Sequence, residues 1–173
     1  EALEETLKDI KHGATRITEI VSGLSKFSRM GRESWQKSDI HEDIESVLVL
    51  LKNKYKSGIR IERDFAEGMP QVECHPGKLN QAFMNVLSNA IDAIYEKKSD
   101  GGILIRTRFD ENEVTVMIQD DGVGMDDEVR AKVFDPFFTT KEIGKGVGLG
   151  MAITHSIVED HRGRLSLETQ LGK

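Results

Sequence analysis

The sequence has one cysteine, no long apolar run and no excess of basic residues, and each absence excludes a class of protein. A single cysteine, Cys74, cannot form an intrachain disulfide framework and is typical of a reducing compartment. No stretch approaches the roughly 20 apolar residues of a membrane-spanning helix, and no signal peptide is visible. A formal net charge of −6 argues against a non-specific surface for nucleic acid or anionic membranes. Any phosphate site must therefore depend on backbone amides and a few local cations.

A length of 173 residues suits one globular domain with an accessory element. Hydrophobic residues at 38% and charged residues at 31% are enough for a core under a soluble surface. The sequence begins at Glu1, without Met, and stops at Lys173 just after a strand-like run. We therefore expect a fragment of a longer cytoplasmic protein, and leave open whether that protein is anchored to a membrane.

Residues 1–30 predict a long helix with a regular apolar seam. Its members recur in steps of four and three: Leu3, Leu7, Ile10, Ala14, Ile17, Val21 and Leu24. One helix cannot bury such a seam, so the pattern favours a partner helix from the same protein or a second copy. The alternative is an amphipathic helix lying on its own domain. Residues 31–38 are polar and predict a linker to a second unit, 39–173.

The second unit alternates helices and strands. Asp39, with Glu42 three positions on, predicts a capping box that opens a helix through about Tyr55. Periods of 3.6 and 2 predict the other elements: helices at about 77–97, 126–132 and 149–158, and strands at 59–65, 103–109, 114–120 and 165–169. We expect an α+β fold, a two-layer α/β sandwich in which helices cover one face of a mixed sheet, preceded by the long bundle helix.

The helix at 77–97 has an apolar face and an unusual polar face. Asn85, Asn89 and Asp92 lie together on the polar side. Asparagine is a poor residue for the middle of a helix, because its amide competes for backbone hydrogen bonds. Two asparagines one turn apart therefore indicate side chains selected for what they bind. The alternative is a solvated face.

Asp120 ends the apolar row of the strand at 114–120 and lies on the same face as that row. A carboxylate in this position is costly unless a donor meets it. Gly122 and Gly124 then let the backbone approach another group closely. Together they predict the floor of a ligand pocket, although a hairpin turn with a solvated aspartate stays open.

A second glycine-rich stretch, 144–150, leads into a helix and has the form of an anion site. Lys141 and Lys145 add cations on a polar segment, 139–147, that suits a mobile lid. The stretch lacks the features of a Walker A or Rossmann loop. Asn89 offers an amide oxygen suited to Mg²⁺, and Asp120 offers an acceptor for an adenine amino group. A nucleotide with Mg²⁺ satisfies all three features.

These segments together resemble the ATP-binding region of bacterial sensor histidine kinases, of the GHKL superfamily. They follow the family's order and spacing: the N box Asn85-x-x-x-Asn89, the G1 box Asp120-x-Gly122-x-Gly124, the F box Phe134–Phe138 and the G2 box Gly144-x-Gly146-x-Gly148-Leu149-Gly150. The match covers about 39–173. It implies a Bergerat-type sandwich, and the first helix resembles the second helix of the dimerisation and phosphotransfer bundle.

On this resemblance the cofactors are ATP and Mg²⁺. Asn89 would coordinate Mg²⁺, Asp120 would read adenine, and Asn85 and Lys141 would act in catalysis. Many relatives place Lys or His near position 92, close to the phosphates, but this chain has Asp92, to which we assign no phosphate role. The expected nucleotide-binding residues are Asn85, Asn89, Asp120, Gly122, Gly124, Phe134, Phe138, Lys141, Lys145, Gly146, Gly148, Leu149 and Gly150.

The resemblance also implies partners: a homodimer through the heptad helix in the full protein, and the receiver domain of a response regulator. The phosphoacceptor histidine is expected upstream of Glu1. His12 lies off the seam, and His41-Glu42 has the expected dipeptide but begins a helix and lacks a following proline. Structural roles are expected for the other histidines, His75, His155 and His161.

Three other functions stay open. An ATPase of the chaperone or mismatch-repair type shares the fold but carries Glu where Asn85 stands, and an amide cannot serve as a general base. An anti-sigma serine kinase lacks the heptad helix. A nucleotide-sensing or dimerisation module would not be an enzyme.

Overall fold

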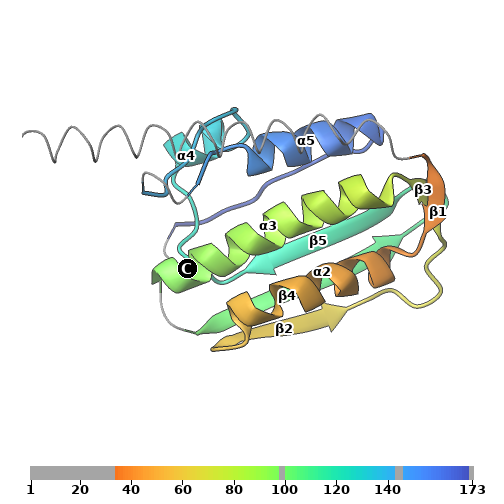
Figure 1. Cartoon of the computed structure of the whole chain (residues 1–173), viewed down its shortest axis with the longest axis horizontal. Coiled ribbons are helices and arrows are strands. Elements are labelled where there is room, and N and C mark those ends of the chain that lie inside the picture. Colours follow the sequence, from red (N-terminus) through yellow and green to blue (C-terminus); the bar gives the residue numbers. More distant parts are fainter. Residues whose placement is uncertain (1–33, 98–99, 143–145, 172–173) are drawn as a thin grey trace, which may run out of the picture.

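The computed structural model describes residues 34–97, 100–142 and 146–171. The predicted heptad helix, with His12, lies outside the described residues, as do 31–33 of the predicted linker and Gly144 and Lys145 of the second glycine-rich stretch. The described part is the predicted α+β sandwich, with helices on one face of a mixed sheet (Figure 1).

The sheet has the strand order β2 (Ile59–Asp64), β4 (Gly101–Phe109), β5 (Val114–Asp120). β2 pairs with β4 in parallel, and β4 pairs with β5 as the predicted antiparallel hairpin. Ile103 lies opposite Asp120, and Ile105 lies opposite Ile118. Because opposite residues in a ladder share a face, Asp120 lies on the same face as these buried isoleucines, as its place in the strand predicts.

Helices α2 (Ile40–Tyr55) and α3 (Pro76–Lys97) cover this face, and α5 (Gly150–Asp160) lies along the other flank of α3 (Figure 1). The core joins apolar stripes of α2 and α3 to β4: Ile44, Val47, Leu48, Leu87, Ile91, Ile94, Ile103 and Ile105 are all buried. α3 is thus the central helix, with a neighbour on each side.

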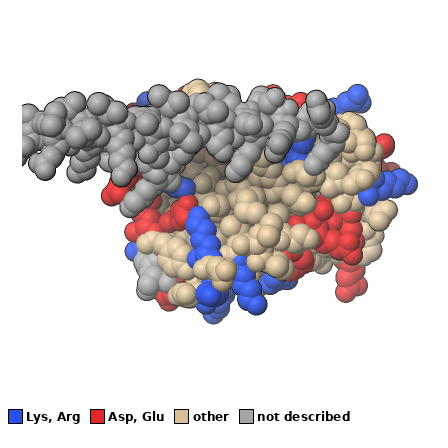
Figure 2. All heavy atoms as spheres, in the orientation of Figure 1, with Lys and Arg blue, Asp and Glu red and all other residues tan. Residues whose placement is uncertain are grey.

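The ends of α2 follow from its sequence. The carboxylate of Asp39 caps the first turn, accepting hydrogen bonds from the amides of His41 at 2.8 Å and Glu42 at 3.3 Å. Acidic residues occupy the first turn and basic residues the last, the order that the helix dipole favours. Figure 2 shows the result, with acidic side chains gathered where α2 begins and basic ones where it ends.

A second, two-stranded sheet was not expected from the sequence. β1 (Gln36–Ser38) pairs antiparallel with β3 (Val72–Cys74), so the last three residues of the predicted linker are part of the folded domain. The thiol of Cys74 is free and buried, and this burial raises its pKa to about 11. It therefore stays protonated at neutral pH.

The strand predicted at 165–169 is not formed. The alternation of partly buried and exposed residues that suggested a strand is present, but the backbone of this stretch forms no ladder. The guanidinium of Arg164 lies 3.2 Å from Glu113, before β5, and the hydroxyl of Thr169 accepts from the amide of Met125, after β5, at 2.8 Å. The stretch lies alongside β5 without joining the sheet.

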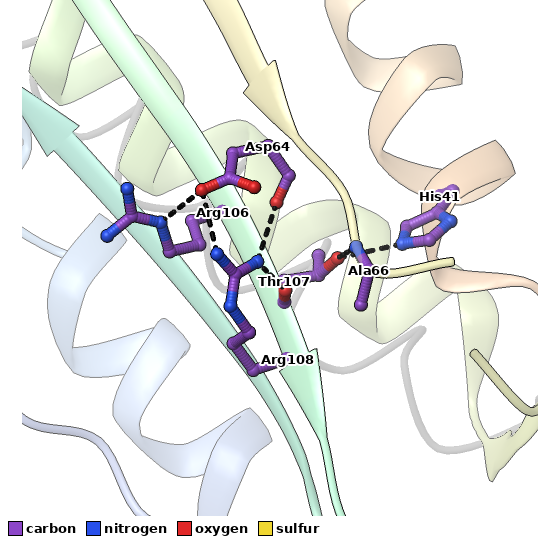
Figure 3. Close-up of polar contacts among 6 residues, drawn as sticks. All are labelled: His41, Asp64, Ala66, Arg106, Thr107 and Arg108. Carbon is purple, nitrogen blue, oxygen red and sulfur yellow. Dashed lines mark hydrogen bonds and ion pairs between the residues drawn. The ribbon is translucent and has the colours of Figure 1, made fainter. Parts of the chain in front are cut away.

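β4 carries polar groups on both faces (Figure 3). Thr107 is fully buried beneath the helices, where its hydroxyl accepts from the amide of Ala66 and contacts the ring of His41 at 2.9 Å. On the uncovered face Asp64 pairs with Arg106 and Arg108, and these hydrogen bonds lower the pKa of its carboxyl group. The open face of the sheet therefore carries exposed ion pairs.

Among the described residues, none of the helices combines the length and apolar character needed to cross a bilayer.

Candidate nucleotide site

Successive turns of α3 hold the predicted motifs together. The first contact is at Asn85, whose amide nitrogen donates to the carbonyl of Gly150 at 2.9 Å and to the hydroxyl of Thr154 at 3.3 Å. Thr154 is itself buried and donates to the same carbonyl at 2.9 Å. Asn85 therefore fixes the first turn of α5 against α3, and with it the end of the second glycine-rich stretch.

One turn further along α3 lies a cluster of charged groups. The ammonium of Lys141 donates to the amide oxygen of Asn89 at 3.3 Å and to Asp92 at 2.6 Å. The ammonium of Lys54, from α2, lies 2.6 Å from the other oxygen of Asp92 and donates to the hydroxyl of Ser88 at 2.7 Å. Desolvation acts to raise the pKa of Asp92, but the hydrogen bonds from both lysines outweigh it and the pKa is lowered. Asp92 is thus ionised at neutral pH.

The third contact joins α3 to the loop after β5. The amide of Val123 donates to the carbonyl of Ala93 at 3.1 Å. A Cβ on Gly122 would lie 2.7 Å from Ala93, so only glycine permits this close approach. Lys97, at the end of α3, donates to the carbonyls of Asp121 at 3.1 Å and Gly122 at 3.3 Å. The loop is therefore fastened along the last turns of α3.

Asp120 lies at the base of this loop. Its carboxylate accepts from the amide of Gly122 at 2.9 Å, which supplies the donor that an acid at the end of an apolar row requires. The residue as a whole is exposed, yet desolvation of the carboxyl group raises its pKa, with the charge of Asp121 adding to the effect and the Gly122 hydrogen bond opposing it. A further hydrogen-bond donor would therefore stabilise the ionised carboxylate of Asp120.

The phenylalanine-rich segment contacts the second glycine-rich stretch. The amide of Phe137 donates to the carbonyl of Gly148 at 2.8 Å, and both residues have left-handed backbones, with φ of 69° and 71°. A φ of this sign is rare and strained for phenylalanine. The ring of Phe134 lies 5.6 Å from that of His155 on α5, and Phe138 is partly buried.

The first turn of α5 has no side-chain cap within the described part of the chain. Leu149 occupies the N-cap position. The first amides of a helix have no partner within the helix, so this end can accept an anion. Gly146 lies beside Thr139 and Lys141, since a Cβ on it would be 3.2 Å from the Thr139 hydroxyl. The predicted phosphate-binding turn and its cation are therefore adjacent.

These residues fit Mg²⁺ as a companion of a nucleotide. Within the described ranges no group of three or more histidine, cysteine or acidic residues could hold a metal. Asn89 offers one neutral oxygen, and the Lys141 ammonium 3.3 Å away would repel a bare divalent cation. Mg²⁺ commonly keeps several waters and takes phosphate oxygens, so one amide oxygen completes its shell once phosphates balance the lysine.

The described histidines have structural contacts. The ring of His41 stacks on that of Phe65, with ring centroids 4.4 Å apart. The Nε2 atom of His161 accepts from the amide of His75 at 3.0 Å, and its Nδ1 lies 2.7 Å from the carbonyl of Ile157. Trp35 packs against both rings. These contacts tie β1 to α3 and α5.

Two residues of this region were not identified from the sequence. Lys54 is outside every motif, but it follows Val47 and Leu51 on the inward stripe of α2, where an apolar residue is expected. A lysine on such a stripe is a usable signal for an acidic partner on a neighbouring helix. Phe137 was recognised only as a member of the F box, 134–138. No feature of the sequence indicates that its backbone is left-handed.

Replacing Asn85 by leucine should loosen α5. The two hydrogen bonds to Gly150 and Thr154 are lost, at a cost of about 1–2 kcal/mol in the free energy of unfolding, because Thr154 still satisfies the Gly150 carbonyl. Hydrogen exchange should show reduced protection in the second turn of α5, beginning with the amide of Ile153, which donates to the Leu149 carbonyl at 2.9 Å, and urea unfolding gives the energy. Asn53→Leu on the exposed face of α2 is the control. Unchanged protection in Asn85→Leu would contradict this role.

Known proteins are similar to this chain in sequence. Residues 74–173 match the family model described as histidine kinase-, DNA gyrase B-, and HSP90-like ATPase. Sporulation kinase E of Bacillus subtilis (strain 168) is 34% identical over 161 residues, which are 91% of this chain and 21% of that kinase. The chain thus spans about a fifth of that relative's length.

Solved structures agree with the sequence comparisons. The catalytic domain of histidine kinase ThkA is 30% identical, with a TM-score of 0.65 over 73% of this chain and 81% of that one. Histidine kinase ThkA in complex with response regulator protein TrrA gives a TM-score of 0.66 at 26% identity, covering 94% of this chain and 46% of that one.

Proposed function

The chain belongs to the family of histidine kinase-, DNA gyrase B- and HSP90-like ATPases, and we propose that it is the ATP-binding catalytic unit of a sensor histidine kinase. In this proposal it transfers the γ-phosphoryl group of ATP to a histidine on a helix that precedes this chain. A response regulator aspartate then receives the group. The observation that carries the proposal is the attachment of three motif segments to α3, at Asn85, Asn89 and Ala93.

The chemistry at Asn85 favours phosphoryl transfer to a protein over ATP hydrolysis. Hydrolysis needs a general base that takes a proton from water, and an amide cannot do so. The amide nitrogen of Asn85 is moreover engaged with Gly150 and Thr154, so the side chain holds the glycine-rich turn. We assign Asn85 a positioning role in catalysis. The relative named above is a kinase, which agrees with this choice.

The proposed mechanism rests on positioning and charge neutralisation. Asp120 accepts from the adenine amino group, and Gly122 and Gly124 shape the loop beside the base, because a Cβ would meet Ala93 at Gly122 and the Gln170 carbonyl at Gly124. The free amides at the start of α5, with Gly146, Gly148, Leu149 and Gly150, hold the phosphates. Lys141 binds the terminal phosphates, assisted by Lys145. Phe134 and Phe138 line the pocket beside the nucleotide. Mg²⁺, held by Asn89, would neutralise developing charge on the phosphates.

The proposal extends to assembly. The heptad helix, residues 1–30, would pair with its copy in a homodimer of the full protein, since its seam needs a partner. A receiver domain would be the second partner, and the ThkA complex with TrrA supports this choice. We place the chain in the cytoplasm, where ATP is supplied.

Calorimetric titration with a non-hydrolysable ATP analogue tests the site. The chain should bind in the micromolar range with Mg²⁺ and more weakly without it. Asn89→Ala should remove most of the Mg²⁺-dependent gain, about tenfold, because one of the metal's oxygen ligands is lost. Asn112→Ala, in the exposed β4–β5 turn, should bind normally. Failure of the wild-type chain to bind would refute the proposed site.

A further inference from the structure

Asp92 joins two lysines that come from different parts of the chain. Each of its carboxylate oxygens lies 2.6 Å from one ammonium group, Lys54 of α2 on one side and Lys141 on the other. Two ammonium groups on one carboxylate lie within a few ångströms of each other. Lys141 also contacts Asn89, the proposed metal ligand, and Asp92 joins Lys54 to the same cluster.

The charges of this cluster do not cancel. Asp92 and Lys141 alone would be neutral as a pair, and Lys54 leaves the cluster with one net positive charge. The side chain of Lys54 is 36% exposed and that of Lys141 is 35% exposed, so the cluster lies close enough to the surface for its charge to act on a ligand. Ser88 holds the Lys54 ammonium through its hydroxyl at 2.7 Å and its carbonyl at 3.3 Å. The position of this charge is therefore fixed from α3.

We infer that Lys54 is a specificity-determining residue of the nucleotide site, whose charge, placed by Ser88 and Asp92, favours a triphosphate over a diphosphate. The inference rests on the proposed function, since it assumes that phosphates lie beside Asn89. Asp92 acts as the positioning residue that keeps two cations together, where their mutual repulsion would otherwise separate them. A local positive potential of this kind favours the ligand with more negative charge.

A purely structural role makes a different prediction. If Lys54 only bridges α2 and α3, its loss lowers stability and weakens all nucleotides equally. If its charge selects the triphosphate, its loss weakens the triphosphate more than the diphosphate. The ratio of the two affinities therefore separates the roles.

The experiment uses the full chain with Lys54→Gln, which keeps a long polar side chain but removes the charge. Affinity for the non-hydrolysable ATP analogue should fall roughly tenfold, and affinity for ADP by less than about threefold. Lys52→Gln, on the same last turn of α2, is the matched control and should leave both affinities unchanged. Thermal unfolding of each variant confirms folding.

Charge restoration completes the test. Lys54→Gln combined with Asp92→Asn leaves Lys141 uncompensated and restores the net charge of the cluster, so affinity for the ATP analogue should recover most of the loss. Equal weakening of ATP analogue and ADP, or no recovery in the double variant, overturns the inference. If the wild-type chain binds neither nucleotide, the proposed function fails instead, so the two failures are distinguishable.

Discussion

Replacing Asp120 by asparagine should weaken binding of the ATP analogue by roughly 10- to 100-fold and at the same time stabilise the fold at neutral pH. A hydrogen bond to a charged acceptor contributes about 1.5–3 kcal/mol, and the asparagine amide would also present a donor to the adenine amino group. The amide oxygen of asparagine can still accept from Gly122, so the loop keeps its shape. The loss therefore reports on recognition of the base.

The stabilisation follows from the direction of the pKa shift. The pKa of Asp120 is raised in the fold above its ordinary value of 3.8, chiefly by desolvation. The folded state thus binds the proton more tightly than the unfolded state, and the stability from this group is present below pH 3.8 and lost as the pH rises through the folded pKa. At pH 7 the ionised carboxylate opposes folding, and asparagine removes that cost.

Thermal unfolding of both chains between pH 4 and pH 8 measures this effect. The melting temperature of Asp120→Asn should exceed that of the wild type at neutral pH, and the difference should shrink as the pH falls. Asp127→Asn, at an exposed carboxylate whose side chain is 95% accessible, removes the same charge and is the control. A variant that loses both stability and binding would indicate a structural role for Asp120.

The main elements of the fold could be predicted because each has a strong local pattern. α3 begins at Pro76 and ends at Lys97, close to the expected 77–97, since one long apolar face defines it. β1 and β3 were missed because a strand of three residues is too short to show an alternating pattern of apolar and polar residues. The stretch 165–169 shows the opposite error, a strand that was predicted but is not formed. Its residues alternate between partly buried and exposed, but this alternation does not require backbone pairing with another strand.

The candidate site was predictable as a set of segments and less so as a set of contacts. Spacing placed Asn85, Asn89 and Asp92 on one face of α3, and the structure attaches a different segment at almost every turn there. The direction of the Asn85 amide toward α5 depends on how two helices pack, which no local pattern encodes. The pairing of Lys54 with Asp92 is tertiary for the same reason.

Gly148→Ala should be the most damaging single change in the second glycine-rich stretch. A Cβ at this position would lie 2.5 Å from the carbonyl carbon of Phe137 and from the oxygen of Phe138, both backbone atoms that cannot rotate away. The backbone φ of 71° adds the strain of a left-handed alanine. We expect a loss of about 2–4 kcal/mol in the free energy of unfolding and at least tenfold weaker nucleotide binding.

Gly68→Ala is a matched control, because Gly68 has the same φ of 71° and no atom within 4 Å of an added Cβ. It should cost only the backbone strain, about 1 kcal/mol, and leave nucleotide binding unchanged. The difference between the two variants in urea unfolding isolates the contact between Gly148 and the phenylalanine segment. That contact also keeps Phe137 in its strained conformation, through the hydrogen bond from its amide to the Gly148 carbonyl at 2.8 Å. If both variants lose the same stability and both bind nucleotide normally, the second glycine-rich stretch and the phenylalanine segment are not coupled.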